Sequence, residues 1–438
     1  MVSYIEKPRY VCALGAFETV LAIERAVPIL HAGPGCGAKL DAGLGNLNGC
    51  QGAGYISPHI LPCTNIGQQE VIFGGDQRLA ETIEHALKIY DGDLFVVLTG
   101  CSAEIVGDDV REVVSRFSQS GKPVIVAETA GFKGSNILGH ELVVDALIDQ
   151  YLTKQGSVNP RLVNLWAPIP YFNSFWAGDL KAIASLLREI GLIPNLVFGP
   201  EGGIQQLNRV PEAAFNLLIS PWAGLKNVIG LQEKFGTPYL HYPVLPIGPT
   251  ETSQFLRRVA QYAHIPGKVA EEVIARHERD YYYFIERASD DLIKTRLLPS
   301  RFYTIADSFY SLGLTRFLVN DMGLIPETQF ITDDTPEAFR PSVKAEFERV
   351  ETSLEVKVEF VQSSGPAQQL IRERGFRGKP LILGSGWEKT FSQQVNAHFL
   401  PLSAPLLERM VLNRTYAGYD GALTLLEDIG SLLLSSYL

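Results

Sequence analysis

Apolar and polar positions along the chain fall into blocks whose lengths are typical of strands followed by helices. Short continuous apolar runs, bounded by glycine, proline or charged residues, indicate strands buried on both faces of a parallel sheet. In the first part of the chain these runs are Val27–His31, Leu94–Leu98 and Pro123–Ala127. Helical spacing of apolar residues is found at Gly15–Arg25, Gln77–Tyr90, Asp108–Ser118 and Glu141–Tyr151. The alternation predicts a doubly wound sheet.

The same alternation continues to the end of the chain. The further predicted strands are Leu162–Ala167, Asn195–Phe198, Leu217–Ile219, Phe302–Ala306, Gln329–Thr332 and Leu381–Leu383. The further predicted helices are Asp179–Ile190, Lys226–Lys234, Glu251–Tyr262, Ile265–Arg296, Ser308–Asp321 and Gly418–Leu434. Gly191 stands where a helix C-cap favours glycine, so it is expected to end the helix before it.

The length of 438 residues is too great for a single hydrophobic core. We therefore predict an α/β protein of three Rossmann-like domains, each with a parallel sheet flanked by helices. The predicted domains are residues 1–155, 156–300 and 301–438. The stretch Gly43–Gly67 is rich in Gly, Asn and Pro and shows little periodicity. Irregular segments of this length in a compact domain are usually functional or cover an interface.

Composition and charge exclude several classes of function. The chain is 46% hydrophobic and 20% charged, and its net charge of −10 comes without any Lys- or Arg-rich run. Phosphate backbones require a basic surface, so nucleic acid is not expected as a partner. No apolar stretch is long enough to span a bilayer, and Met1–Arg9 lacks a signal-peptide core. We expect a cytoplasmic protein. Phe73-Gly-Gly-Asp76 lacks the features of a nucleotide loop and predicts a tight turn with an N-cap.

Five cysteines, all within the first 101 residues, carry the candidate chemistry. Cys36 and Cys101 each follow a predicted strand and a glycine turn and precede a predicted helix, and Cys12 lies at a similar junction. Ligands gather at the carboxyl ends of parallel strands. The partial positive charge at a helix N-terminus favours the thiolate, which is the form that binds metals. These three cysteines therefore indicate a soft-metal site. No Ser–His–Asp signature accompanies them, and no catalytic residue is predicted in this chain.

Other interpretations of these residue types remain open. Free cysteines are often inert core residues, and three thiolates are one fewer than ordinary zinc or iron–sulfur sites need, unless a second subunit supplies the rest. Cys50 and Cys63 are expected to be structural or interface thiols. Asp108 or Asp109 is expected to cap a helix. The histidines His31 and His59 flank the cysteine turns and are candidates for tuning a bound cluster.

Four motifs in a fixed order give the chain a resemblance to a nitrogenase-type component 1 subunit. They are Cys12-Ala-Leu-Gly-Ala16, His31-Ala-Gly-Pro-Gly-Cys36, Val71-Ile-Phe-Gly-Gly75 and Gly100-Cys-Ser-Ala-Glu-Ile-Val-Gly-Asp-Asp109. Thr415-Tyr-Ala-Gly-Tyr-Asp-Gly421 resembles the closing helix of the family.

The resemblance implies that Cys12, Cys36 and Cys101 ligate a P-cluster-type 8Fe–7S iron–sulfur cluster shared with an alpha-type subunit. No cysteine follows Cys101, so the chain resembles the beta-type partner, which carries no active-site cofactor. Aligning Gly134-Ser135 with the family places Gly131 where the molybdenum-type beta subunit has a serine near the cluster.

The resemblance also implies a reaction and an assembly. A separate ATP-hydrolysing iron protein would pass electrons through the cluster to a cofactor in the alpha-type partner of an α2β2 heterotetramer. The missing serine, the short N-terminal lead and the Gly43–Gly67 stretch favour a methylthio-alkane reductase, which cleaves carbon–sulfur bonds. The alternatives are a dinitrogen-reducing enzyme, a cofactor-assembly scaffold of the same fold, and a non-redox small-molecule binding protein.

Overall fold

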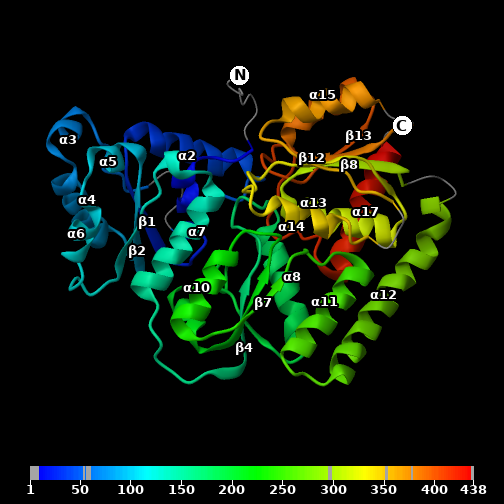
Figure 1. The fold of residues 1–438 in the computed structure, drawn as a ribbon, viewed down its shortest axis with the longest axis horizontal. Helices are drawn as coiled ribbons and strands as arrows, with labels where there is room; N and C mark the ends of the chain where they lie inside the picture. The colour runs from blue at the N-terminus through cyan, green and yellow to red at the C-terminus, as the bar shows by residue number, and fades with distance from the viewer. Residues whose placement is uncertain are drawn as a thin grey trace.

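The structure, a computed structural model, describes residues 9–52, 55, 61–293, 298–350, 354–375 and 378–435. It contains three separate sheets in which every strand pair is parallel. In Figure 1 the unit with the first sheet lies on the left in blue and cyan, the second lies at the bottom in green, and the third lies at the upper right in yellow to red. The predicted α/β class with parallel sheets flanked by helices is confirmed.

The first sheet has the strand order β1, β2, β3, spanning Ala26–His31, Leu94–Thr99 and Val124–Ala127. Nearly all of its residues are buried, as expected for strands covered by helices on both faces. The α-helices of this unit are α1 Phe17–Leu21, α2 Pro34–Leu47, α3 Gln68–Phe73, α4 Asp76–Ile89, α5 Cys101–Val106, α6 Val110–Ser115 and α7 Asn136–Ala146. Three short turns of other helix types are η1 Ala13–Ala16, η2 Gly131–Lys133 and η3 Leu147–Tyr151. The three predicted strands are confirmed to within a residue or two.

Two predictions in this unit are wrong in part. The helix expected over Gly15–Arg25 ends at Leu21, and Arg25 adopts a positive φ of 61° while its Nε donates to Asp93 at 2.9 Å. The irregular stretch expected from Gly43 begins later, because α2 continues to Leu47. Several residues of that stretch, 53–54 and 56–60, lie outside the described residues.

The second sheet has the strand order β5, β4, β6, β7, spanning Ile193–Asn195, Asn159–Trp166, Ala213–Ile219 and Tyr239–Tyr242. Its helices are α8 Trp176–Glu189, α9 Ile204–Arg209, η4 Val210–Glu212 and α10 Leu225–Phe235. Gly191 follows α8 with φ +92°, as predicted for its C-cap. The strand predicted over Asn195–Phe198 instead ends at Asn195, because the following residues leave the sheet and Gly199 N donates to Ala22 O of the first unit at 2.8 Å.

The third sheet has the strand order β11, β10, β8, β12, β13, with β9 also paired to β8. These strands span, in that order, Val358–Phe360, Gln329–Ile331, Arg301–Ala306, Leu381–Gly384, His398–Pro401 and Ile325–Pro326. The helices around it are α13 Ser308–Arg316, η5 Phe317–Asp321, α14 Arg340–Phe347, α15 Ser364–Arg374, η6 Gly386–Glu388 and α16 Lys389–Gln394.

Three helices tie the units together: α11 Gly248–Tyr262, α12 Gly267–Ile293 and α17 Gly418–Ser435. The last described helix, α17, returns to pack against α11 and α12 (Figure 1). One large apolar core extends through residues of all three units, with two smaller clusters beside it. The predicted domain limits, 1–155, 156–300 and 301–438, stay a prediction. Among the described helices, none is both long enough and apolar enough to cross a bilayer.

Candidate metal centre

Cys12 is held in an extended conformation directly before the short helix η1. It forms an isolated antiparallel bridge with Ser135, in which Ala13 N donates to Gly134 O at 2.9 Å and Asn136 N donates to Val11 O at 2.8 Å. The backbone on both sides of Cys12 is therefore fixed by the segment that leads into α7.

Cys36 and Cys101 lie at the carboxyl ends of adjacent parallel strands. Cys36 is in the first turn of α2, after β1, and Cys101 is the first residue of α5, after β2. The two turns are joined directly, because Gly100 N donates to His31 O at 2.9 Å. The predicted order of strand, glycine turn and helix start is confirmed at both cysteines.

Gly131 lies close to the sulfur atoms of both Cys12 and Cys101. A Cβ atom built on this glycine would lie 3.2 Å from Sγ of Cys12 and 3.2 Å from Sγ of Cys101. The two sulfur atoms are therefore separated by no more than twice that distance. Glu104 of α5 fixes the loop that carries Gly131, because it accepts a hydrogen bond from Ala130 N at 3.1 Å and pairs with Lys133 at 2.8 Å.

Cys36 lies close enough to both sulfur atoms to be affected by their charge. Burial raises the pKa of the Cys36 thiol above its usual value, and the sulfur atoms of Cys12 and then Cys101 raise it further. For Cys36, burial and the neighbouring sulfur atoms therefore outweigh the stabilisation of the thiolate that we expected from the helix N-terminus. Three neighbouring thiols cannot all carry charge cheaply at a partly buried site unless cations compensate them.

The donor set fits a polynuclear cluster better than a single ion. Within the described residues, no three His, Cys, Asp or Glu side chains are placed to hold one metal ion. Cys12 and Cys101 meet at Gly131 and Cys36 lies near both, an arrangement that suits a cluster in which different iron atoms each take a cysteine sulfur. Because a cysteine thiol loses its proton when it binds such a cluster, the raised pKa of Cys36 is compatible with that use.

The other two cysteines have different surroundings. Cys50 is exposed and adopts φ +58°. Cys63 is half-buried beside β1, where it pairs with Leu30 and its Sγ donates to Ala32 O at 3.5 Å. Burial raises the pKa of Cys63, and the nearby sulfur of Cys36 contributes to the same shift. Cys63 therefore lies alongside a strand, although its sequence context indicated none. The roles predicted for Cys50 and Cys63 stay predictions.

A buried hydrogen-bond network connects the two strand-end cysteine turns. His31 Nε2 and Asp108 Oδ2 are 2.9 Å apart, and His31 Nδ1 lies 3.2 Å from the Thr64 hydroxyl. Asp108 Oδ1 also accepts from Gly75 N at 2.7 Å. Burial lowers the pKa of His31 against the opposing effect of Asp108, so the ring is neutral at pH 7.

One expectation about the residues around this network is confirmed, and another falls outside the described residues. Asp109 caps α6 by accepting from Glu112 N at 3.1 Å, as predicted for one of the two aspartates. Asp108 has a different task, since its carboxylate links the Cys101 helix end to the Cys36 turn and to the start of α4. His59 lies outside the described residues. The sequence offered no sign of the contact between His31 and Asp108, because the two residues are far apart in the chain.

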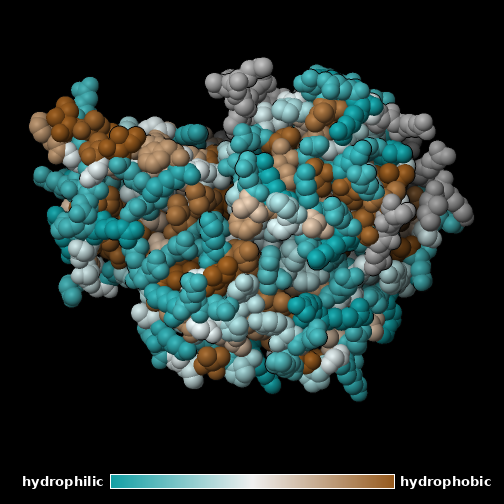
Figure 2. All heavy atoms as spheres, viewed as in Figure 1, coloured by the Kyte–Doolittle hydropathy of each residue, from teal (hydrophilic) through white to brown (hydrophobic). Residues whose placement is uncertain are grey.

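An exposed apolar surface adjoins the Cys101 helix. The apolar α3 patch consists of Val71, Ile72 and Phe73 of α3 with Ile105 of α5, against which α3 packs. Phe73 is 84% exposed and Ile105 is 74% exposed. In Figure 2 the patch forms the brown area at the upper left, over α3 and α5. Sequence reasoning saw only a turn at Phe73-Gly-Gly-Asp76. The run of three large apolar residues in so short a helix could have indicated the patch.

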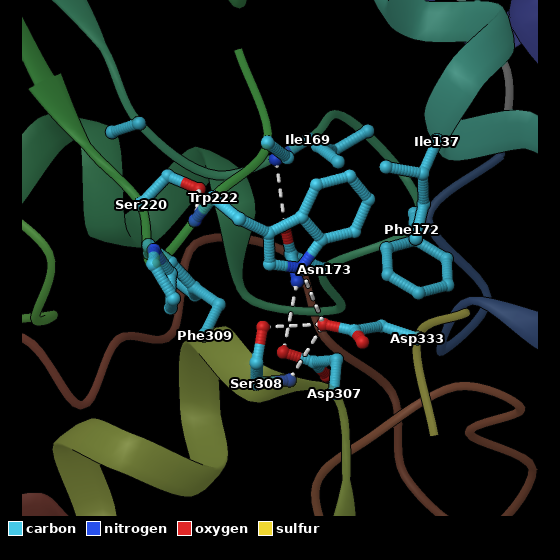
Figure 3. Close-up of a pocket in the computed structure, with 13 residues that line it drawn as sticks. Ile137, Ile169, Phe172, Asn173, Ser220, Trp222, Asp307, Ser308, Phe309 and Asp333 are labelled. Atoms are coloured by element: carbon cyan, nitrogen blue, oxygen red, sulfur yellow. Dashed lines mark hydrogen bonds between the residues drawn. The ribbon is translucent and has the colours of Figure 1, made fainter. Parts of the chain in front are cut away.

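A polar cluster between the second and third units is structural. Figure 3 shows Asn173 and Trp222 pointing toward two buried carboxylates, Asp307 and Asp333. Asn173 Nδ2 donates to Asp307 Oδ1 at 3.2 Å, and Trp222 Nε1 donates to Asp333 Oδ2 at 3.2 Å. Burial raises the pKa of Asp307 to about 7. The cavity beside them has a volume of only about 20 Å³, enough for roughly one water molecule.

Comparison with known families decides the family of the chain. Residues 12–434 match the family described as "Nitrogenase component 1 type Oxidoreductase". The chain belongs to the nitrogenase component 1 family. The match extends from the first of the three clustered cysteines to the last helix.

Individual relatives place this nitrogenase component 1 chain on the beta side of the family. It is 24% identical to the nitrogenase molybdenum-iron protein beta chain of Methanothermobacter thermautotrophicus over 97% of this chain and 93% of that one. It is 23% identical to the beta chain of Azotobacter vinelandii over 96% of this chain and 82% of that one. An alpha chain from Azospirillum brasilense is 26% identical but covers 69% of this chain and 65% of that one.

The fold of this component 1 chain is also that of a solved nitrogenase. A structure described as "Nitrogenase Cp1 at pH 6.5" superposes with a TM-score of 0.81 and covers 100% of this chain and 95% of that one, at 20% identity. The nitrogenase component 1 fold is thereby confirmed, and the relatives named above that match nearly the whole chain are beta chains.

Proposed function

We propose that this beta-type chain relays electrons from an ATP-dependent iron protein to a cofactor held by an alpha-type partner in an α2β2 heterotetramer. Cys12, Cys36 and Cys101 would hold this chain's half of a P-cluster-type 8Fe–7S cluster. When bound, such a cluster accepts and donates single electrons, which is the chemistry that a relay requires. The single observation that carries the proposal is that Cys12 and Cys101 meet at Gly131 while Cys36 lies near enough to both for their charge to affect it, although the three come from distant parts of the sequence.

The chain's own residues would do the positioning. The neighbouring strand ends of β1 and β2 set the spacing of Cys36 and Cys101, and the bridge to Ser135 sets that of Cys12. The neutral His31 ring and the Asp108 carboxylate keep both strand-end turns in place without adding a charge on His31 beside the thiolates. Hydrogen bonds around the residues that ligate a metal orient those ligands and tune the properties of the metal.

The apolar α3 patch supports a docking partner on the same side of the chain. Monomeric proteins rarely leave several large apolar side chains exposed together unless they meet another protein. Because α3 packs on α5, whose first residue is Cys101, a partner on the patch would sit close to the proposed cluster. An iron protein bound there would have a short electron path.

The cysteine assignment is tested by substitution in the anaerobically purified complex. Cys36→Ala and Cys101→Ala are expected to lose cluster iron and reductase activity together. Cys50→Ala is the matched control, because Cys50 is exposed and is not among the three gathered thiols. Iron analysis, electron paramagnetic resonance and turnover with the iron protein are the measurements. Full activity in either of the first two variants would contradict the proposal.

For the substrate, we propose reductive cleavage of methylthio-alkanes. In this reaction two electrons and two protons break one carbon–sulfur bond of dimethyl sulfide, giving methanethiol and methane. Support comes from Gly131, which offers no side-chain oxygen where the molybdenum-type resemblance expects a serine. Dinitrogen reduction is the second candidate, because the relatives that span the whole chain are named as nitrogenase beta chains. Parallel assays with dimethyl sulfide and dinitrogen decide between them: ammonia without methane would refute the first choice.

A further inference from the structure

All three units contribute walls to one large cavity. Its volume is about 630 Å³. Val11 and Glu18 line it from the first unit, Tyr171 and Phe172 from the second, and Trp387 and Pro405 from the third. Cavities of roughly 300–1,000 Å³ at domain junctions are where small organic ligands bind. The cavity is large enough for a molecule with two or three rings.

The walls are mainly apolar and one of them is held in an uncommon conformation. Tyr171, Phe172 and Trp387 present aromatic surface. Tyr171 adopts φ +63°, a left-handed conformation that an aromatic residue rarely takes and that persists only where the surrounding structure enforces it. Such backbone strain is concentrated at ligand sites, which agrees with a use for this aromatic wall.

Two buried hydrogen-bond donors at the cavity lack a partner. Arg9 Nε and Asn48 Nδ2 make no hydrogen bond within the described part of the chain, and both residues line the cavity while being 4% exposed. Leaving a buried donor unpaired is unfavourable. Both atoms are covered by protein in this conformation, so each side chain has to turn toward the cavity before a ligand with acceptor atoms can pair with it and recover that free energy. These donors favour a ligand with an oxygen-bearing head.

The two donors belong to the same side of the cavity. Arg9 pairs with Glu388, which follows the wall residue Trp387. Asn48 forms a bridge with Leu406, which follows the wall residue Pro405. The turns of these two wall residues are joined, because Gly386 N donates to Pro405 O at 2.8 Å.

Charge at the cavity favours a single negative group. The guanidinium of Arg9 is already balanced by the buried carboxylate of Glu388. Lys39 adds a cation to the lining. Burial raises the pKa of Glu18 to about 8, so this carboxyl is mainly protonated at pH 7 and adds no negative charge. Asp334 lies beside the lining residue Tyr10, so an anionic head is favoured near Lys39 rather than near Tyr10.

The cavity does not suit a second metal cofactor. Of the residues that line it, none is a histidine, and Cys12 is the one thiol. The proposed function already uses Cys12, on the side of the cavity that carries Gly131. The remaining lining offers aromatic rings and nitrogen donors, which recognise an organic molecule.

We propose that this cavity binds an organic monocarboxylate with an apolar, aromatic-sized body. The carboxylate oxygens accept hydrogen bonds from Arg9 Nε and Asn48 Nδ2. The body of the ligand lies against Tyr171, Phe172 and Trp387. The ligand takes no part in electron relay. The cavity shares Cys12 and Gly131 with the proposed cluster site, but its aromatic wall does not depend on the cluster.

The test uses anthracene-9-carboxylate, a fluorescent monocarboxylate, with the anaerobically purified complex. Saturable binding at one site per beta-type chain is expected. Ala42→Trp should fill the cavity from α2, and Asn48→Leu should remove one donor; each should weaken binding by roughly tenfold or more, as the loss of a buried hydrogen bond or of space implies. Ala275→Trp on the exposed side of α12 is the matched control and should bind normally.

Three further measurements make the result decisive. Phe73→Ser should leave binding unchanged, which separates the cavity from the apolar α3 patch. The neutral analogue 9-anthracenemethanol should bind at least several-fold more weakly. Iron content is measured in every variant. Loss of ligand binding in a variant with full iron is assigned to the cavity. Ligand binding by an iron-free complex would support this inference while contradicting the proposed function. No saturable binding, equal affinity in Ala42→Trp, or equal affinity for the alcohol would overturn the proposal.

Discussion

Substituting Gly131 by alanine is the most direct probe of the gathered sulfur atoms. The new Cβ would lie 3.1 Å from Cys12 Cβ and 3.2 Å from each of the sulfur atoms of Cys12 and Cys101. These distances are shorter than ordinary van der Waals contacts, so both thiol groups have to move by a few tenths of an ångström. Glu104 and Lys133 restrain the Gly131 loop, which limits how far the backbone can yield.

The expected cost of Gly131→Ala follows from overpacking in a fixed environment, about 1–3 kcal/mol. If that cost falls on cluster binding, the affinity for the cluster decreases roughly 5- to 150-fold, since about 1.4 kcal/mol corresponds to a factor of ten. The assay is iron per beta-type chain together with the amplitude of the cluster signal in electron paramagnetic resonance, both measured after anaerobic purification.

Gly37→Ala is the matched control for this experiment. Gly37 follows Cys36 directly, but a Cβ there would meet nothing closer than Leu30 Cδ1 at 3.9 Å. Alanine is also the better helix former within α2. Full iron content in Gly131→Ala, equal to that of Gly37→Ala, would refute the inference that the three thiols share one crowded volume.

Three further predictions concern stability and docking. Burial lowers the pKa of His140 from 6.5 to about 4, so the unfolded chain binds a proton at a higher pH than the folded chain does. The free energy of unfolding is therefore highest above pH 6.5 and falls by about 3 kcal/mol as the pH drops to about 4. In acid unfolding curves, His140→Gln should reduce this loss. Asp108→Ala leaves the His31 ring and Gly75 N without their acceptor. In a denaturant titration it should lower the free energy of unfolding by about 1–3 kcal/mol, and Asp108→Asn should give a value between that of Asp108→Ala and that of the parent. An unchanged free energy of unfolding would contradict the network. Phe73→Ser should leave the free energy of unfolding within about 0.5 kcal/mol of the parent, because Phe73 is exposed. In a binding titration it should weaken binding of the iron protein by roughly tenfold or more. Unchanged affinity would exclude the apolar α3 patch as the docking surface of the iron protein.

Local sequence was sufficient for most of the secondary structure. Leu94–Leu98 is a strand because its continuous apolar run suits a central strand of a parallel sheet, and α8 ends where Gly191 takes a positive φ. The same local logic placed Cys36 and Cys101 after strands. It failed at Asn195–Phe198, where an equally apolar run leaves the sheet because a contact with Ala22 of another unit competes with strand pairing.

The interior of the candidate site depended on contacts between distant residues. Glycine carries no side chain that points to chemistry. The resemblance alone placed Gly131 near the cysteines, and in the structure its position follows from the Cys12–Ser135 bridge and from the contacts of Glu104 with its loop. The helix dipole at Cys36 could be read from the sequence, but burial and neighbouring sulfur outweigh it. The pairing of Arg9 with Glu388 likewise joins the two ends of the chain, and no local pattern announces it.

That last pairing sets an order of maturation during synthesis. Arg9 binds the carbonyl of Ile305 and the side chains of Ser364 and Glu388, partners that leave the ribosome hundreds of residues later. The contacts that position the cysteines all lie within the first unit, which can form as soon as it is translated, because domains fold in the order they are made. A nascent or prematurely terminated chain would thus present its sulfur atoms before the cavity lined by Tyr171, Phe172 and Trp387 has formed. The metal half-site and the organic-acid site would come into being at opposite ends of translation.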